Sequence, residues 1–372
     1  MKTTDRPEER MAPGEGEVAT TIREAGLCQL VTAARADAIA AATLLATGCD
    51  ASGIPFHVCA IRTREELRSR LASADPDTDT VVIGADGHGT PVIADPPVSG
   101  RAHAVASELG ADPDASLALA GVVAAGFDPA DAVPELLSRA DADPTTGVAV
   151  PTEDPADGLA HTTLAHADFS GEKRRAEEEL AELGASPEPR DVASLLAIAA
   201  TGPAGASTRS ATAIERSIRP YRIPGPFATV GGYADVLSAL VRRSPGLAIT
   251  LTMTGEGRDA ALSAWRERAV RTHAAVRSAD TERYDGLLVA HVDGPVAPVA
   301  RLLRDFRSPE PTVLAVDDGE AAIAATETDV AGSIEAGADA AGGSGLGHGR
   351  RGYARFEAGA TDALVDAVRG AT

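Results

Sequence analysis

The chain has 372 residues, enough for two domains, and 44% of them are hydrophobic, which excludes an acidic disordered protein. Acidic residues outnumber basic ones by 55 to 34, which gives a net charge of −21 and excludes a broadly basic nucleic-acid-binding surface. Only Lys2 and Lys173 are lysines, and this excess of carboxylates with so little lysine is typical of a protein from a high-salt cytoplasm.

Strands and helices alternate in the N-terminal part of the chain. We expect strands at 27–33, 56–61, 80–87 and 90–97. Helices are expected between them, at 36–48 with Gly48 as its C-cap and at 63–73. This order predicts a doubly wound parallel sheet with right-handed crossovers.

The middle of the chain is expected to be helical, and a second α/β pattern follows it. The middle helices are expected at 101–110, 116–126, 131–140, 172–183, 191–201 and 210–221. Further helices are expected at 233–243, 258–279, 295–307 and 361–370. Strands are expected at 246–254, 286–292, 312–318 and 321–327, before a glycine-rich segment at 341–359.

The segment "RIPGPFATVGG" at 222–232 is rich in proline and glycine and indicates a domain boundary. We expect a disordered tail at 1–20, an α/β domain with a helical extension at 21–224, and a smaller C-terminal α/β domain at 225–372. The segment order thus predicts a two-domain α/β protein.

Nothing in the sequence predicts export or membrane insertion. The first residues are polar, and no charge-free apolar run approaches the roughly 18 residues that a membrane span needs. The three cysteines form no CxxC pair, so we expect buried thiols in a reducing cytoplasm: Cys28, Cys49 and Cys59.

Carboxylates follow three of the expected N-terminal strands. Asp37, Asp86 and Asp95 each come after a strand, at the edge of a doubly wound sheet where ligands bind. Three converging carboxylates are a candidate site for a divalent metal, because hard cations prefer oxygen ligands. The alternative is that each is a turn residue or a helix N-cap, and the residues alone favour this alternative.

Three segments then resemble a known family: "GVAVPTEDPADGLAHTTLAHADFSG" (147–171), "GPFATVGGYADVL" (225–237) and "ARLLRDFRSPEPTVL" (300–314). Together with the segment order from residue 27 onward, they resemble the DHH phosphoesterase superfamily, and within it the RecJ-like proteins of halophilic archaea. The resemblance implies an N-terminal α/β catalytic domain and a smaller C-terminal domain that grips substrate. Active members of the family use two manganese ions to hydrolyse phosphodiester bonds, often from the 5′ end of single-stranded DNA.

The family's metal ligands are only partly matched. The first motif, Asp-x-Asp-Gly, is matched by Arg35 and Asp37 at its two aspartate positions, and the next ligand by Asp86. We expect the Arg35 guanidinium to pair with Asp37 or Asp86 and so to occupy the place of a metal.

The remaining ligand positions are also changed. The signature Asp-His-His is matched by Asp95, Pro96 and Pro97, and the final aspartate by Ala125. Because a two-metal mechanism needs bridging carboxylates, we expect a catalytically degenerate site that needs no cofactor, with manganese or magnesium bound only if the protein is active.

The family's C-terminal domain carries a Gly-Gly-His element that holds substrate phosphate. The resemblance assigns this role to Gly342, Gly343, His348, Arg350 and Arg351. Backbone amides in a glycine-rich turn, backed by arginines, suit a phosphate. The alternative is a flexible, solvated loop.

Other singled-out side chains favour structural roles. His161 and His166 are expected to be polar packing residues, with metal ligation as the alternative, because their spacing is not the helical metal pair. Trp265 is expected in the core or at a domain contact.

The resemblance implies a function in DNA replication or repair. Relatives without metal ligands serve as scaffolds in the replicative helicase, bound to GINS and close to single-stranded DNA, and we expect this role here. The alternative is a metal-dependent, single-strand-specific 5′ exonuclease with a one-metal site from Asp37, Asp86, Asp95 and His88. A phosphoesterase of small molecules is a third, less supported possibility.

Overall fold

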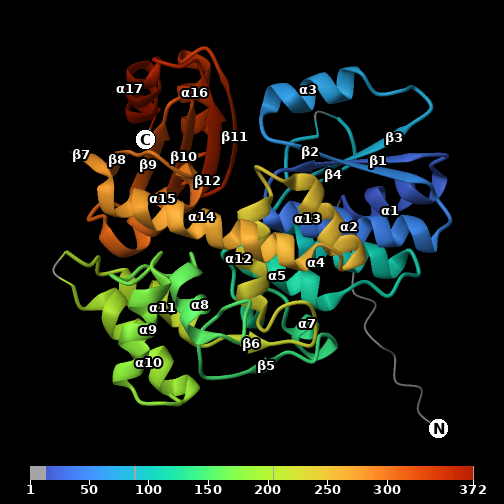
Figure 1. The fold of residues 1–372 in the computed structure, drawn as a ribbon. Coiled ribbons are helices and arrows are strands. Elements are labelled where there is room, and N and C mark those ends of the chain that lie inside the picture. The colour runs from blue at the N-terminus through green and yellow to red at the C-terminus, as the bar shows by residue number, and fades with distance from the viewer. Residues whose placement is uncertain (1–13, 88, 204, 372) are drawn as a thin grey trace, which may run out of the picture.

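The computed structural model describes residues 14–87, 89–203 and 205–371, which form a mixed α/β protein (Figure 1). Four parallel strands form the N-terminal sheet in the order β2–β1–β3–β4. Their bounds are β1 (Cys28–Ala33), β2 (Phe56–Ile61), β3 (Asp79–Ile83) and β4 (Val92–Ile93). All residues of β1 are buried, which explains its continuous apolar character. The predicted parallel sheet is confirmed.

Helices cover both faces of this sheet (Figure 1). On one face α2 (Ala36–Ala51) packs against α4 (Val98–Glu108) and α5 (Ala115–Ala125), and α3 (Arg64–Ala72) lies on the other. The prediction that the first of these helices ends at Gly48 is wrong, because α2 continues to Ala51. A Cβ at Gly48 would lie 2.8 Å from Leu109 Cδ1, so this glycine permits close helix packing instead.

Part of the expected N-terminal tail is helical. Helix α1 (Glu15–Glu24) contains residues 15–20 and buries Val18, Ala19 and Ile22 against the N-terminal domain. Residues 1–13 lie outside the described part of the chain.

The middle of the chain forms a helical layer, drawn in green in Figure 1. Its helices are α6 (Pro129–Ala132), α7 (Pro134–Arg139), α8 (Pro155–His161), α9 (Lys173–Glu182), α10 (Pro189–Thr201) and α11 (Ser210–Ile218), with a small ribbon of β5 (Asp143–Pro144) and β6 (Tyr221–Arg222). Pro134 divides the helix that was expected over 131–140, because proline cannot donate to the preceding turn.

Three helices then lead back across the N-terminal domain: α12 (Val230–Leu240), α13 (Pro245–Thr254) and α14 (Arg258–Ser278). The strand expected at 246–254 is wrong, because this segment is α13. Pro245 opens the helix and Gly255, in the left-handed conformation, closes it. Within the described residues, no helix combines the length and the apolar character needed to cross a membrane.

The C-terminal part is built on a mixed sheet of order β11–β12–β10–β9–β8–β7. The strands are β7 (Asp280–Tyr284), β8 (Leu287–His291), β9 (Thr312–Asp317), β10 (Glu320–Ala325), β11 (Ser344–His348) and β12 (Arg351–Arg355). Helix α15 (Val296–Leu302) and the π-helix η1 (Leu303–Arg307) cover one face, whereas α16 (Ala331–Ala340) and α17 (Thr361–Ala371) cover the other. The predicted second α/β unit is confirmed.

The glycine-rich segment at 341–359 contains the β11–β12 hairpin, which packs directly on α16. A Cβ at Gly347 would lie 2.3 Å from Ala331 Cα, and one at Gly352 would lie 2.3 Å from Ile334 Cγ2. These distances are shorter than any real carbon contact, so the glycines allow the helix to touch the backbone of the hairpin.

The packing does not divide the chain at the expected boundary of 224 and 225. Residues between 227 and 265, among them Phe227, Tyr233 and Trp265, belong to the same apolar core as the N-terminal sheet. We therefore propose that the first domain extends through α14 and that the smaller C-terminal domain begins at β7.

Replacing Gly347 with alanine is expected to lower the free energy of unfolding by about 2 kcal/mol, because the new methyl group meets the α16 backbone. Chemical denaturation at high salt measures this. Gly332→Ala is the matched control on α16, where nothing lies within 4 Å of a Cβ, and it should leave stability unchanged or slightly higher. Equal effects of both variants would contradict the packing role.

Candidate functional site

Asp37 is buried in the first turn of α2, where its carboxylate faces the beginning of α4. The backbone N–H groups of Val98 and Ser99 donate to Asp37 Oδ2 and Oδ1, both at 2.9 Å. Burial raises the pKa of Asp37, whereas these hydrogen bonds and the charge of Arg35 act to lower it. The carboxylate therefore supplies the cap that Pro97, the residue at the N-cap position of α4, lacks.

Asp86 and Asp95 lie at the same edge of the sheet, after β3 and β4, but both are exposed. The Asp95 side chain is 76% exposed and lies 3.7 Å from the Arg101 guanidinium, whereas Asp37 is buried. His88 lies outside the described residues. The structure therefore confirms the shared edge but does not bring the three carboxylates together around one point.

The other substituted positions supply no ligands. Pro96 and Pro97 precede α4, and Ala125 is the last residue of α5. Among the described residues, no group of three or more histidine, cysteine, aspartate or glutamate side chains is arranged to hold a metal ion. The described residues thus do not fit the two-manganese centre that the resemblance implies.

Arg35 lies between β1 and α2, and its guanidinium rests against Gly84. A Cβ at Gly84 would lie 3.1 Å from Arg35 Nη2, and the φ of +73° at Gly84 also favours glycine. Arg35 and Asp37, both described, are not within ion-pair distance, but the charge of each favours the charged form of the other. The expected pairing of Arg35 with Asp37 or Asp86 stays a prediction.

The predicted phosphate-binding residues are divided between the two ends of the β11–β12 hairpin. Gly342 and Gly343 precede β11, next to Glu357 and Arg355, whereas His348 lies at the far end of that strand. The glycine pair and the basic residues therefore do not form one phosphate loop. Phosphate binding by either part stays a prediction.

The basic end of the hairpin contacts the N-terminal domain. Arg351 Nη1 donates to the Ala124 carbonyl at 2.7 Å, whereas Arg350 Nη1 donates to Thr326 O at 3.0 Å and is exposed. His348 Nε2 is buried without a hydrogen-bond partner among the described residues. Burial, together with the nearby charge of Arg35, lowers the pKa of His348. His348 and Arg35 therefore face the same space between the domains.

A second part of the cleft between the domains is strongly cationic. This cleft of about 590 Å³ is lined by the arginines Arg62, Arg242, Arg243, Arg268 and Arg355, with the carboxylates of Asp317, Asp318 and Glu320. Burial lowers the pKa of Arg242 and of Arg268 to about 10, so both remain charged at neutral pH. Arg242 also lies 3.8 Å from the centre of the Tyr353 ring. Such a cleft attracts anions on an otherwise acidic protein.

Charged contacts close the cleft at α3. Arg64 Nη1 lies 2.7 Å from Glu335 Oε2, and Arg64 Nη2 lies 3.0 Å from Asp339 Oδ2. The Glu65 backbone N–H donates to Ser344 Oγ at 3.1 Å. Polar contacts of α3 with α16 and β11 thus join the two domains.

Known proteins resemble this chain over its full length. Residues 279–370 match the family described as "Uncharacterized protein rrnAC1427, C-terminal domain". Uncharacterized protein rrnAC1427 of Haloarcula marismortui is 42% identical over 395 aligned residues, which cover 99% of each chain. The chain belongs to the rrnAC1427 family.

Solved structures of low identity share the fold of this rrnAC1427-family chain. Exonuclease RecJ bound to manganese aligns with a TM-score of 0.51 and 14% identity, over 97% of this chain and 95% of that one. CDC45 from Entamoeba histolytica aligns with a TM-score of 0.59 and 11% identity, over 96% and 99%. This chain therefore shares the fold of RecJ and CDC45, and the predicted RecJ-like resemblance is confirmed at the level of the fold.

The three segments that carried the resemblance meet around Asp235. The Thr163 backbone N–H and the Trp265 Nε1–H each donate to Asp235 Oδ2 at 2.9 Å. Arg301 Nη2 donates to the Thr163 carbonyl at 2.6 Å. Asp235 and Trp265 are buried, so the polar groups of these segments hold α12, α14, α15 and the loop after α8 together.

Asp157 links α8 to α14 in the same region. Arg266 donates to both carboxylate oxygens of Asp157, at 2.8 and 2.9 Å, and His161 Nδ1 lies 3.0 Å from Asp157 Oδ1. Burial acts to raise the pKa of Asp157, but Arg266 holds it below its usual range. The favoured interpretation of His161 as a polar packing residue agrees with these contacts.

His166 forms a buried pair with His273. Their Nδ1 atoms are 3.0 Å apart, and their rings stack with centroids 5.2 Å apart. Burial and the charges of neighbouring groups lower the pKa of each to about 3, so both rings are neutral at neutral pH. Sequence alone predicted the packing role of His166 but not this partner, because His273 lies on α14.

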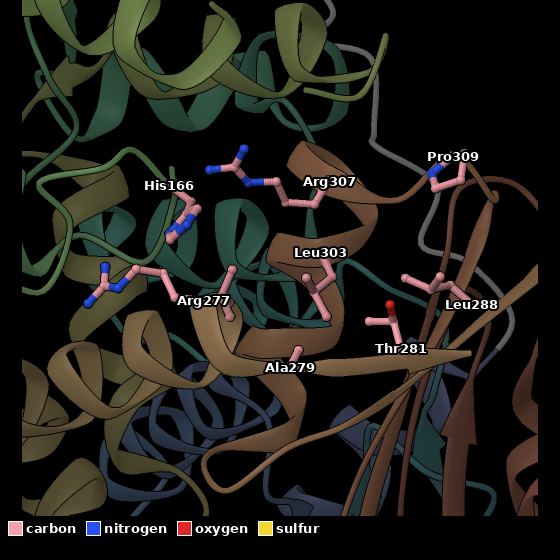
Figure 2. Close-up of a pocket in the computed structure, with 9 residues that line it drawn as sticks. His166, Arg277, Ala279, Thr281, Leu288, Leu303, Arg307 and Pro309 are labelled. Carbon is pink, nitrogen blue, oxygen red and sulfur yellow. The ribbon is translucent and has the colours of Figure 1, made fainter. Parts of the chain in front are cut away.

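His166 also lines a groove of about 400 Å³ at the junction of the helical layer and β7 (Figure 2). Figure 2 shows the ring of His166 between Arg277 and Arg307, with Leu303 beside them. The groove thus has a polar, cationic end and an apolar end.

Replacing Asp37 with alanine is expected to lower the free energy of unfolding by about 2 kcal/mol, because two buried N–H groups of α4 lose their acceptor. Denaturant unfolding measures this. Asp95→Ala removes an exposed carboxylate from the same edge and should cost less than about 0.5 kcal/mol. An equal free energy of unfolding for Asp37→Ala and the wild type would contradict the role of this carboxylate as the cap of α4.

The His166–His273 pair is expected to make the fold sensitive to acid. Below pH 6.5 the unfolded chain binds protons that the folded pair excludes, so stability falls with pH until about pH 3. By about pH 5.5 each histidine should have removed about 1 kcal/mol. The free energy of unfolding, measured by denaturation at several pH values in this range, should depend less on pH in the double variant His166→Asn/His273→Asn than in the wild type. Exposed His57→Asn is the control, and an unchanged slope in the double variant would contradict the assignment.

Proposed function

We propose that this chain is a RecJ-like protein of DNA replication or repair that does not hydrolyse phosphodiester bonds. We propose further that it acts as a scaffold of the replicative helicase, bound to GINS, in the cytoplasm of a halophilic cell. The observation that supports a non-catalytic role is the engagement of Asp37: both of its oxygens accept hydrogen bonds from α4. A carboxylate in this position cannot bridge two cations without releasing the helix.

The cleft between the domains supports contact with single-stranded nucleic acid. Arg62 and Arg243 line its open part, Arg35 lies near His348, and Arg242 is stacked on Tyr353. Guanidinium groups bind phosphate oxygens through charge-assisted hydrogen bonds, which suits the backbone of a nucleic acid. In this proposal the fixed charge of the arginines attracts the phosphate backbone, while no group activates water.

The second candidate is a metal-dependent 5′ exonuclease, which the fold shared with manganese-bound RecJ and the exposed Asp86 after β3 favour. This candidate requires a metal site, and Asp37 does not contribute to one while both of its oxygens accept hydrogen bonds from α4. Nuclease activity with manganese distinguishes the two candidates.

We expect purified protein to bind 5′-labelled single-stranded DNA and to leave it intact when manganese is added. Arg62→Ala and Arg243→Ala should each weaken binding several-fold, because each removes a phosphate contact, whereas Arg174→Ala on exposed α9 should not. Electrophoretic mobility and product length measure binding and cleavage together.

Manganese-dependent degradation that is lost in Asp86→Ala would overturn the non-catalytic proposal. Calorimetric titration with manganese gives an independent measure, in which tight stoichiometric binding would favour the enzyme. The scaffold role is tested by affinity capture from the native cytoplasm at high salt, which should recover GINS or helicase subunits.

A further inference from the structure

The groove beside His166 is not part of the cleft that the proposed function uses. It lies between the loop that carries His166, the end of α14, the edge strand β7 and η1 (Figure 2). Its size, about 400 Å³, falls in the range of small-ligand sites. Three features of its chemistry together define what it can bind.

The first feature is a pair of arginines whose charge is only loosely neutralised. Arg307 lies 3.8 Å from Asp168, whose side chain is 80% exposed, and Arg277 lies 3.6 Å from Glu172. Both separations exceed hydrogen-bond length. Arg277 donates one hydrogen bond to Ser170 O at 2.6 Å, which leaves further N–H groups of its planar fork for a ligand. This end of the groove therefore suits a carboxylate or another anion with paired oxygens.

The second feature is a histidine whose proton position is determined by its neighbours. His273 Nε2 lies 3.0 Å from the Thr162 carbonyl, which can only accept, so His273 carries its proton on Nε2. His273 Nδ1 is therefore an acceptor, and His166 Nδ1 must donate to it across 3.0 Å. A neutral His166 is left with a lone pair on Nε2. The ligand must therefore present an N–H or O–H donor to that atom.

The third feature is an apolar wall, to which Leu303, Val276 and Leu288 contribute. Leu303 and Arg307 begin and end the π-helix η1, whose closing bond runs from the Ser308 N–H to the Leu303 carbonyl. The wider turn carries both side chains to the groove. Such π-helical turns occur frequently at functional sites.

We infer that this groove binds the free C-terminus of a partner polypeptide that ends in an apolar residue. The terminal carboxylate contacts Arg277 and Arg307, the last backbone N–H donates to His166 Nε2, and the last side chain packs on Leu303. A C-terminus carries these three groups within one residue, and its capture is a known mode of peptide recognition. A free inorganic anion lacks the apolar group.

A nucleotide also carries an anion and donors, but the groove offers it no stacking surface. Among the described lining residues, His166 is the one aromatic ring, and its face is taken by His273. The peptide is therefore the better match. This inference goes beyond the proposed function, because it concerns a different face and holds whether or not the cleft binds nucleic acid.

The test uses the full chain and the fluorescein-labelled peptide Gly-Ser-Leu-Leu with a free C-terminus. Fluorescence anisotropy in about 1 M KCl, where the Debye length is about 3 Å, reports short-range contacts rather than long-range attraction. Saturable binding is expected. Amidation of the C-terminus should weaken it at least about tenfold, and N-methylation of the last amide, which removes the donor to His166, should also weaken it at least about tenfold.

Protein variants test the same contacts from the other side. Arg307→Ala should weaken the free-acid peptide about tenfold and the amide little, whereas Arg174→Ala should change neither. Absence of binding, equal binding of acid and amide, or displacement of the peptide by adenosine monophosphate would overturn the inference. None of these outcomes bears on DNA binding or manganese binding in the cleft, so the two proposals fail separately.

Discussion

The carboxylate of Asp37 is the contact on which the N-terminal domain is organised. It joins the first turn of α2 to the first turn of α4, and these two helices cover one face of the parallel sheet. The start of α4 carries an N-terminal dipole and unsatisfied N–H groups that a proline at the N-cap position cannot serve. The aspartate that the resemblance matches to a metal ligand therefore stabilises a helix here.

Because Asp37 caps α4, the positive charge of the cleft between the domains comes from arginine side chains. Arg35 lies near His348 between the domains, and Arg242 and Arg268 add charge further along the cleft. A bound metal both attracts phosphate and activates water, whereas guanidinium groups do only the first. The non-catalytic role that we propose rests on this difference.

The element order could be predicted from hydrophobic patterning, and the two α/β units follow from it. Helix α13 was missed because its β-branched and apolar residues were read as a strand, although Pro245 and Gly255 signalled a helix with capped ends. The sequence left the segment 341–359 open between a phosphate-binding turn and a solvated loop, because the close contacts of its glycines with α16 involve residues such as Ala331 that precede them in the chain.

The candidate sites are formed by side chains that lie far apart in the sequence, so their contacts could not be predicted from spacing. Asp37 meets residues 61 and 62 positions away, and His166 meets His273 at a separation of 107. The arginine cleft combines side chains that follow β2 and α12 with others on α14 and β12, so no single run of basic residues predicted it. Only the short segments that resembled a family pointed to the fold as a whole.

The glycines of the β11–β12 hairpin have one more consequence. Because no Cβ separates the hairpin from α16, the backbone of the hairpin that carries Arg350 packs directly on that helix. Helix α16 also carries Glu335 and Asp339, the two partners of Arg64 on the opposite domain. The hairpin therefore packs on the same helix that makes the charged contacts with the opposite domain.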